Sequence, residues 1–135
     1  MSRNHVNELA AEYGFVYMFF QGGNTPVYIG KTIDPVKRLA MHFRTKQSAI
    51  KGIEEMKNIG LIKIAHVGDG RDAIALEAGL IFKYSPILNS QIGSRIPIKR
   101  MKFNEGDYEW ASFTPSEFLQ DYTIIYRCLS RKGIA

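Results

Sequence analysis

The stretch FVYMFFQGGNTPVYIG, residues 15–30, decides the fold of this chain. It opens with Phe15 to Phe20, a continuous apolar run rich in β-branched and aromatic side chains, which is typical of a buried strand. Glycine and asparagine in the following turn tolerate the positive φ that tight hairpins need. The chain then returns through Val27 to Gly30. We therefore expect a β-hairpin that places Tyr17 and Tyr28 on neighbouring strands.

Asp34 and Pro35 predict the start of a helix directly after the hairpin. Asp34 can accept hydrogen bonds from free backbone N–H groups, and proline suits the first helical position because it has no N–H to leave unpaired. Arg38 and His42 are four residues apart and therefore share one face of this helix. Taken singly, Arg38 fits an exposed salt-bridge partner, His42 fits a helix-surface histidine, and the two tyrosines fit core packing. Only as a set do they indicate a site.

A carboxylate interrupts an otherwise apolar helix surface further along the chain. We expect a third strand over Leu61 to Val67 and then a helix from Asp72 to Tyr84, which carries Glu77. The neighbours of Glu77 on its helix face are Ala73, Ile74, Leu80, Ile81 and Tyr84. An unpaired carboxylate on a buried face costs several kcal/mol, so Glu77 needs a proton, a cation or a metal ion. An ion pair with Arg38 or Lys31 meets this need as well as a metal does.

Four further elements are expected from local patterns. Helices are predicted from Asn4 to Tyr13 and from Ser48 to Asn58, and a hairpin is predicted to pair Ile96–Phe103 with Tyr108–Phe113. A capping box at residues 114–117 predicts a final helix, whose side chains include Phe118, Leu119, Tyr122, Ile125 and Tyr126.

These elements predict the fold class α+β: a small domain with a short three-stranded antiparallel sheet flanked by helices. The 135 residues are expected to form a single domain. Residues 91–135 are expected to form a C-terminal extension that packs on the preceding elements or contacts a partner.

The charge of the chain indicates a polyanionic partner. There are 18 Lys and Arg against 13 Asp and Glu, which gives a net charge of +5 and a pI near 9.4. The excess gathers in two runs, within residues 31–51 and 94–103. The side chains predicted to contact nucleic acid are Lys31, Lys37, Arg44, Lys46, Arg95, Lys99, Arg100 and Lys102. Either run alone fits a solvated surface, but two runs beside a candidate phosphate site favour contact with nucleic acid. Lys31 also follows Gly30, whose missing side chain is expected to let a ligand approach the backbone.

The single cysteine and the lack of a long apolar stretch exclude several kinds of site and segment. The single cysteine, Cys128, excludes an intramolecular disulfide and a cysteine metal cluster, and no disulfide partner is expected. No apolar stretch approaches the ~20 residues that cross a bilayer, and residues 1–5 lack the apolar region of a signal peptide. We therefore expect an intracellular, cytoplasmic protein with no membrane partner. The sequence leaves the oligomeric state open.

An ordered series of residues resembles the GIY-YIG nuclease family. Phe15-Val16-Tyr17 stands where the first motif stands, and Tyr28-Ile29-Gly30 is the second motif intact. The series continues with Arg38, His42, Glu77 and Asn89. The resemblance covers residues 15–90, with one clear departure, because Phe15 replaces the glycine of the first motif. That position supplies backbone rather than chemistry, so we expect it to tolerate the change.

The resemblance implies a metal-dependent DNA endonuclease that hydrolyses phosphodiester bonds with one divalent cation, Mg²⁺ or Mn²⁺. Glu77 would bind the cation, and a single carboxylate is sufficient because Mg²⁺ keeps several waters. Arg38 would hold the phosphate oxygens as charge grows on phosphorus. One tyrosine would help deprotonate the attacking water, with Tyr17 favoured as the base and Tyr28 as the group that orients the water or phosphate. His42 would accept the tyrosine proton.

Two further residues complete the implied catalytic set. Lys31 would help to favour the phenolate, and Asn89 would steady the site by hydrogen bonding. The alternative is a non-catalytic nucleic-acid-binding module on the same scaffold, and a third possibility is a structural or protein-interaction domain. Arg38 and Glu77 argue against the binding module, because a pure binder gains little from a buried acid near a polyanion.

Overall fold

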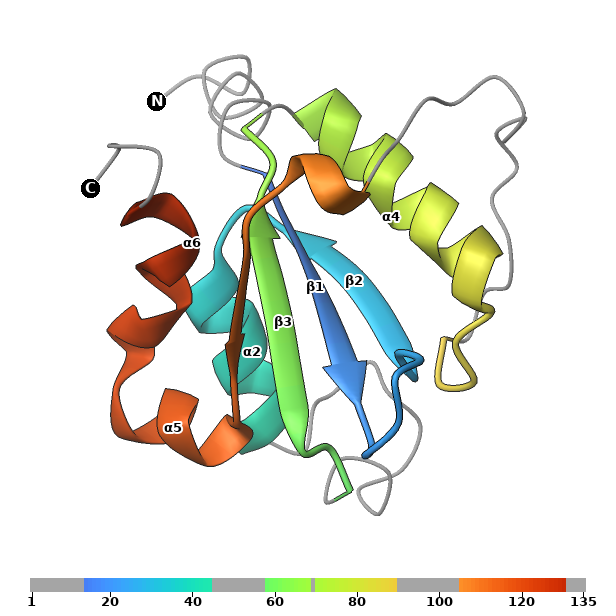
Figure 1. The fold of residues 1–135 in the computed structure, drawn as a ribbon. Coiled ribbons are helices and arrows are strands. Elements are labelled where there is room, and N and C mark those ends of the chain that lie inside the picture. The colour runs from blue at the N-terminus through green and yellow to red at the C-terminus, as the bar shows by residue number, and fades with distance from the viewer. Residues whose placement is uncertain (1–13, 45–57, 69, 90–104, 131–135) are drawn as a thin grey trace.

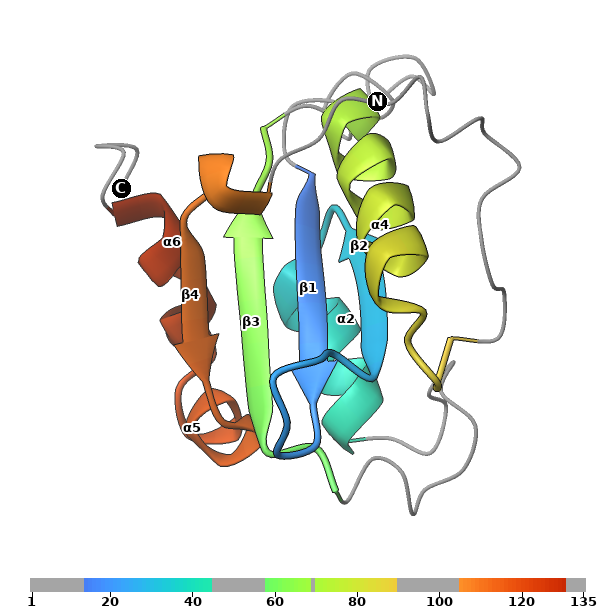
Figure 2. The same cartoon turned by 45° about the vertical axis from the view of Figure 1, so that its right-hand side comes forward.

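The computed structural model describes residues 14–44, 58–68, 70–89 and 105–130. A four-stranded antiparallel sheet forms the centre, with the strand order β2-β1-β3-β4 (Figures 1 and 2). Its strands are β1 (Phe15–Phe20), β2 (Tyr28–Thr32), β3 (Leu61–His66) and β4 (Trp110–Phe113). The α+β class is as expected, but the expected three strands are wrong because β4 extends the sheet along β3. The strand predicted over residues 96–103, and with it the hairpin, lies outside the described residues.

The hairpin of β1 and β2 forms as the sequence predicts. Tyr17 lies opposite Gly30, and Phe19 lies opposite Tyr28, so both tyrosines face the same side of the sheet. Gly22 in the connection has a φ of 104°, which glycine adopts without the steric cost a side chain would add. Val27 lies just before β2, and its N–H donates to the Phe19 carbonyl over 2.7 Å.

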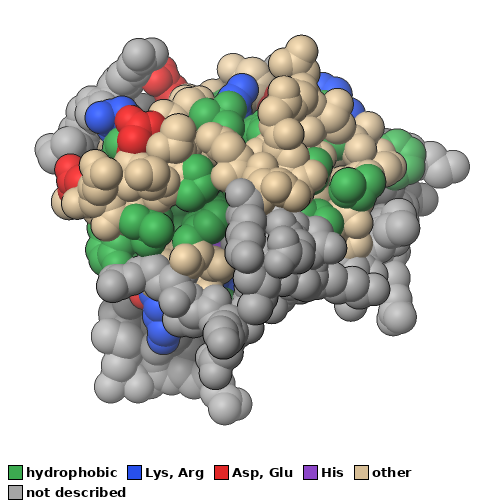
Figure 3. Space-filling view, turned by 90° about the horizontal axis from the view of Figure 1, so that it is seen from below, with side chains coloured by type: hydrophobic (Ala, Val, Ile, Leu, Met, Phe, Trp, Pro, Cys, Tyr) green, Lys and Arg blue, Asp and Glu red, His purple; other side chains and the backbone are tan. Residues whose placement is uncertain are grey.

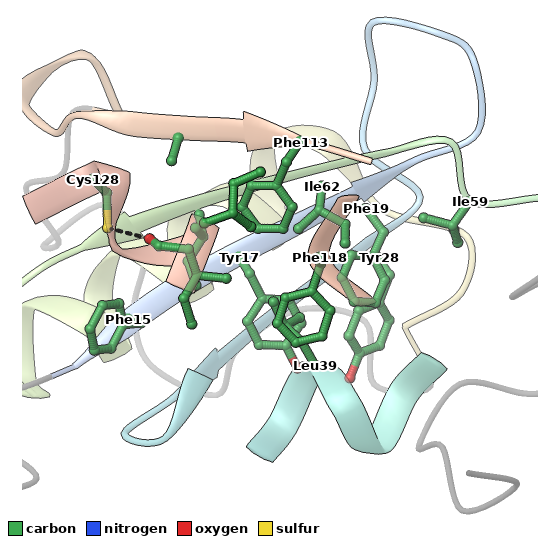
Figure 4. Close-up of a cluster of buried hydrophobic side chains, with 14 residues drawn as sticks. Phe15, Tyr17, Phe19, Tyr28, Leu39, Ile59, Ile62, Phe113, Phe118 and Cys128 are labelled. Carbon is green, nitrogen blue, oxygen red and sulfur yellow. Dashed lines mark hydrogen bonds between the residues drawn. The ribbon is translucent and has the colours of Figure 1, made fainter. Parts of the chain in front are cut away.

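Helices cover both faces of the sheet, which explains why every residue of β1 is apolar and buried. Alternate residues of β1, including Tyr17 and Phe19, belong to a core shared with residues of α2 (Pro35–Arg44) and α5 (Pro115–Gln120). Val16 and Met18 point to the opposite face, where they pack with residues of α4 (Gly70–Tyr84). Figure 4 shows the first of these cores, in which Tyr17, Tyr28 and Leu39 lie together.

The helix starts match the local signals in the sequence. The Asp34 Oδ1 accepts from the Lys37 backbone N–H over 3.1 Å, which confirms Asp34 as the cap of α2. Helix α4 begins two residues before the predicted Asp72 and ends where predicted, at Tyr84. The helix predicted over residues 4–13 lies outside the described residues, and so does the helix predicted over residues 48–58 except for Asn58, which lies in a turn. In the part of the chain that is described, no helix has both the length and the apolar character needed to span a membrane.

The C-terminal segment is one helix in the sequence prediction but three short helices in the structure. Helix α5 starts with the predicted capping box between Thr114 and Glu117. At Asp121 the backbone turns extended, with φ −150° and ψ 100°, and the chain continues as η3 (Tyr122–Tyr126) and α6 (Arg127–Ser130). The Asp121 carboxylate accepts from the Thr123 N–H over 3.0 Å, so it caps a new helix and ends the old one.

Candidate functional site

Tyr17 is the centre of a hydrogen-bonded group on the α2 face of the sheet. Its side chain is fully buried, and its hydroxyl lies 3.0 Å from the Nε2 of His42. The Arg38 Nε donates to the same hydroxyl over 3.3 Å. The spacing of Arg38 and His42 on one helix face therefore brings both side chains to one phenol, as the sequence predicts. The view of His42 as a surface histidine is wrong, since its side chain is only 2% exposed.

Gly30 makes room for this phenol. A Cβ atom added at Gly30 would lie 2.5 Å from both the Cζ and the hydroxyl oxygen of Tyr17. Real Cβ atoms do not approach other atoms so closely, so any side chain here would displace the ring. The expectation that the glycine admits a ligand to the backbone is therefore wrong, because the Tyr17 side chain fills that space. The phenol lies across β2, an edge strand.

Tyr28 lies beside this group. Its ring centroid is 6.2 Å from that of Tyr17 and 5.5 Å from that of His42, and its side chain is 8% exposed. Figure 4 shows the phenol oxygens of Tyr17 and Tyr28 both pointing toward α2. The two tyrosines are therefore both core residues and neighbours in the candidate site.

Burial sets the protonation states of the group. Desolvation, followed by the nearby Tyr28, raises the pKa of Tyr17 well above its ordinary value, although Arg38 opposes this rise. Burial, together with the charge of Arg38, lowers the pKa of His42 to about 4. At neutral pH the phenol is therefore protonated and the imidazole is neutral. This arrangement lets Arg38 donate to the Tyr17 oxygen while the Tyr17 hydroxyl donates to His42.

We predict that His42 stays neutral down to acidic pH. Its folded pKa of about 4 lies below the ordinary 6.5, so between these values the unfolded chain binds the proton more readily. Protonation of His42 in the folded chain therefore costs roughly 3 kcal/mol more than in the unfolded chain. The free energy of unfolding keeps its full value above pH 6.5 and falls as the pH drops toward 4. Titration of the His42 imidazole by NMR should give a midpoint near 4, and a midpoint near 6.5 would contradict this environment.

Glu77 lies on the other face of the sheet, on α4. Its carboxylate is 23% exposed, and its Oε1 lies 3.9 Å from the Nζ of Lys31. Lys31 points to this face because it lies opposite Val16, whose side chain packs with α4. The helix surface around Glu77 is less buried than predicted, since Ile74 is 43% exposed. Of the two partners considered for an ion pair, Lys31 forms one.

The two halves of the candidate site meet at the edge strand β2. The Tyr17 phenol covers Gly30 on one face, and Lys31, the next residue, reaches Glu77 on the other. Burial raises the pKa of Glu77, while the charge of Lys31, a hydrogen bond from the Lys31 backbone and the charge of Arg38 lower it in part. The Glu77 charge in turn raises the pKa of Tyr17. The carboxylate and the phenol are therefore close enough to interact electrostatically.

Glu77 could hold a divalent cation with help from water. Among the described residues, no three or more His, Cys, Asp or Glu side chains are grouped so that they could bind a metal. Mg²⁺ needs only one or two carboxylates because it keeps several waters. The Glu77 side chain is partly exposed, and the Lys31 ammonium lies beyond hydrogen-bond distance, so a hydrated ion fits this donor set.

Asn89 acts on the backbone of β2. Its Oδ1 accepts from the Ile29 N–H over 3.0 Å, and its Nδ2 donates to the Ile29 carbonyl over 2.8 Å. The Leu88 N–H also donates to the Val27 carbonyl over 2.8 Å. The segment after α4 therefore completes the hydrogen bonds of this edge strand as a neighbouring strand would. These contacts hold the backbone between Tyr28 and Gly30.

Thr32 holds the connection between β2 and α2, a role that the sequence predictions did not include. Its Oγ1 accepts from the Asp34 backbone N–H over 3.0 Å. This contact fixes the connection between β2 and α2, and thus the spacing of Lys31 and Arg38. A threonine two residues before an aspartate at a helix start is the signal that could have revealed it.

Little of the predicted DNA-binding surface can be located. Lys31 and Lys37 are exposed, and Arg44 is the last residue of α2. The other predicted contacts lie outside the described residues: Lys46, Arg95, Lys99, Arg100 and Lys102. On the face seen in Figure 3, the Lys and Arg side chains of the described residues stand apart rather than forming a continuous patch. Contact with DNA through the two basic runs stays a prediction.

Known proteins share this fold and sequence. The model of the UvrC-like GIY-YIG domain matches residues 14–90. UvrABC system protein C of Thermosipho africanus is 35% identical over 92 residues, which are 67% of this chain and 16% of that protein. Excinuclease cho of Escherichia coli K12 is 28% identical over 104 residues, which are 76% of this chain and 34% of that protein. The chain thus spans 16% and 34% of the length of these two curated relatives.

Crystal structures agree with these matches. The N-terminal GIY-YIG endonuclease domain of UvrC from Thermotoga maritima, bound to magnesium as its catalytic divalent cation, superposes with a TM-score of 0.50 at 28% identity. The match covers 66% of this chain and 99% of that domain. A point mutant of the same domain with its catalytic cation gives 0.51 at 26% identity, over 67% of this chain and all of that one. The chain belongs to the family of UvrC-like GIY-YIG domains, which confirms the family resemblance predicted from the sequence.

Proposed function

We propose that this chain hydrolyses DNA phosphodiester bonds with one divalent cation bound at Glu77. The observation that carries the proposal is the Tyr17 hydroxyl, which is hydrogen-bonded to both Arg38 and a neutral His42. This hydroxyl packs over Gly30 of β2, and the next residue of β2, Lys31, reaches Glu77. DNA is the inferred substrate because the similar Cho protein is named an excinuclease and the matching UvrC domain is named an endonuclease domain. The magnesium bound by the UvrC domain supports Mg²⁺ as the cation, with Mn²⁺ as an expected substitute.

Glu77 is the residue that would hold the cation. A bound divalent ion neutralises charge on a phosphate oxygen and stabilises the leaving oxygen. The partial burial of Glu77 favours this use, because a carboxylate removed from water gains more from a cation than an exposed one does.

Tyr17 and His42 would move the proton of the attacking water. The Tyr17 oxygen takes a proton from the water while its own proton passes to the His42 Nε2, which is already 3.0 Å away. A buried phenolate is costly, so this exchange suits a tyrosine whose pKa is raised. His42 can accept because it is neutral at physiological pH.

Arg38, Tyr28, Lys31 and Asn89 would place the substrate. Arg38 binds the phenol through Nε, and its guanidinium has further N–H donors for phosphate oxygens. Tyr28 would orient the water or the phosphate from the neighbouring strand. Lys31 is exposed and adds positive charge at the same edge. Asn89 would act indirectly, by holding the β2 backbone that carries Tyr28 and Gly30.

The Tyr17→Phe variant is expected to cleave DNA roughly 10²- to 10⁴-fold more slowly while it binds DNA as the wild type does. Phenylalanine keeps the ring over Gly30 and removes only the hydroxyl that contacts Arg38 and His42. Single-turnover cleavage and fluorescence anisotropy measure the two quantities. Tyr126→Phe is a matched control, because Tyr126 is 41% exposed and lies in η3, and it should cleave at the wild-type rate. Equal rates in both variants would remove Tyr17 from the mechanism.

A plasmid assay separates the proposed enzyme from a binding module on the same scaffold. Supercoiled plasmid is incubated with the protein and Mg²⁺ or Mn²⁺, with and without a chelator. The proposal predicts nicking that the chelator abolishes. Binding of the plasmid without nicking in either metal would favour the non-catalytic module instead.

A further inference from the structure

The Lys31 ammonium lies beside the Glu77 carboxylate, which is the group that would bind the metal ion under the proposed function. Its Nζ lies 3.9 Å from the Glu77 Oε1, and the two side chains are 43% and 23% exposed. The antiparallel register places Lys31 opposite Val16, so its side chain must project onto the face that α4 covers. The register of the sheet therefore directs the Lys31 side chain toward α4, which carries Glu77. The separation exceeds a hydrogen bond, so charge rather than a directed bond holds the ammonium there.

We propose that Lys31 is an internal counter-cation that a divalent ion must displace, so that metal loading is coupled to DNA binding. This inference rests on the proposed function. An ammonium and a divalent ion repel each other at one carboxylate, so Lys31 weakens metal binding while it stays there. A DNA phosphate at the site offers the displaced ammonium a new anionic partner. DNA therefore raises the affinity for the metal, and the metal raises the affinity for DNA by the same factor.

Lys31 is able to leave its partner, whereas the neighbouring cation is not. Arg38 also acts electrostatically on Glu77, but its Nε is held by the Tyr17 hydroxyl at 3.3 Å. Lys31 is nearly half exposed and carries its charge on a flexible stem, and exposed ion pairs of this kind contribute little to stability. Moving its ammonium from Glu77 to a phosphate therefore costs little.

The first test measures Mn²⁺ binding without DNA, by the loss of the free-ion signal in electron paramagnetic resonance. The Lys31→Met variant keeps the length of the stem and removes the charge, so it should bind Mn²⁺ about tenfold more tightly than the wild type. The Lys63→Met variant removes the same charge from β3, which β1 separates from β2 in the sheet, and should stay within about twofold of the wild type. Glu77→Gln should abolish the binding. Circular dichroism verifies that each variant is folded, and Lys31→Gln provides a second neutral side chain.

The second test adds a short DNA duplex at saturation in a Tyr17→Phe background, which keeps the DNA intact. The duplex should tighten Mn²⁺ binding about tenfold with Lys31 present and much less with Lys31→Met. Equal Mn²⁺ affinities for wild type and Lys31→Met, or an equal effect of DNA on both, would overturn this inference and leave the proposed function standing. Failure of any variant to bind Mn²⁺ through Glu77 would overturn both.

Discussion

The Glu77→Gln variant is expected to lose DNA cleavage by at least about a thousandfold while it keeps its fold. A bound cation supplies several kcal/mol of transition-state stabilisation, and each 1.4 kcal/mol corresponds to about tenfold in rate. Glutamine has nearly the same shape but no charge, so it cannot replace the carboxylate as a ligand for Mg²⁺. The side chain is partly exposed, and the ion pair lost with Lys31 is a weak one, so the free energy of unfolding should change little.

The effect on cleavage should be specific to this carboxylate. Measured without a divalent ion, DNA affinity should be unchanged or slightly higher, since the substitution removes a negative charge near the phosphate. Glu117→Gln is the matched control, because glutamine can serve equally in the capping box at the start of α5. It should cleave at the wild-type rate. Cleavage by Glu77→Gln within tenfold of the wild type would show that the metal is held elsewhere.

The Gly30→Ala variant should be damaged in both stability and activity. The new methyl group would lie 2.5 Å from the Tyr17 Cζ and hydroxyl oxygen, so the phenol must move. Overpacking of this kind costs about 1–3 kcal/mol of the free energy of unfolding, which urea denaturation measures. A phenol displaced by about 1 Å from Arg38 and His42 should slow cleavage about a hundredfold or more.

Gly60 offers a matched control for this substitution. A Cβ added at Gly60 meets no atom within 4 Å. Gly60→Ala should therefore fold and cleave as the wild type does, and it should gain a few tenths of a kcal/mol from the stiffer unfolded chain. If Gly30→Ala matches Gly60→Ala in both assays, the close packing of Tyr17 over β2 is not a requirement of the site.

Local patterns were sufficient for the elements that carry the phenol and its partners. The apolar run from Phe15 to Phe20 predicts β1, and the cap at Asp34 predicts α2, because each signal lies within a few neighbouring residues. The spacing of Arg38 and His42 then predicts that both side chains share a face, which the contacts with Tyr17 confirm. The part of a site whose residues lie one helix turn apart can therefore be inferred from the sequence.

Features that depend on distant parts of the chain were missed. Strand β4 pairs with β3, about fifty residues earlier, and no local pattern identifies that partner. The burial of His42 follows from the packing of α2 against the sheet. The residue's place on its own helix predicts only a surface histidine. The role of Gly30 likewise depends on a side chain from the neighbouring strand. Each is a property of tertiary packing rather than of sequence spacing.

The position of a bound Mn²⁺ ion tests the central claim most directly. Crystals of the protein grown with Mn²⁺ would locate the ion by its anomalous scattering. The account predicts one strong peak about 2.1 Å from a Glu77 carboxylate oxygen, at the edge strand β2, with waters as the other ligands. A peak at other residues, or none at Glu77 under conditions in which the protein cleaves DNA, would contradict it.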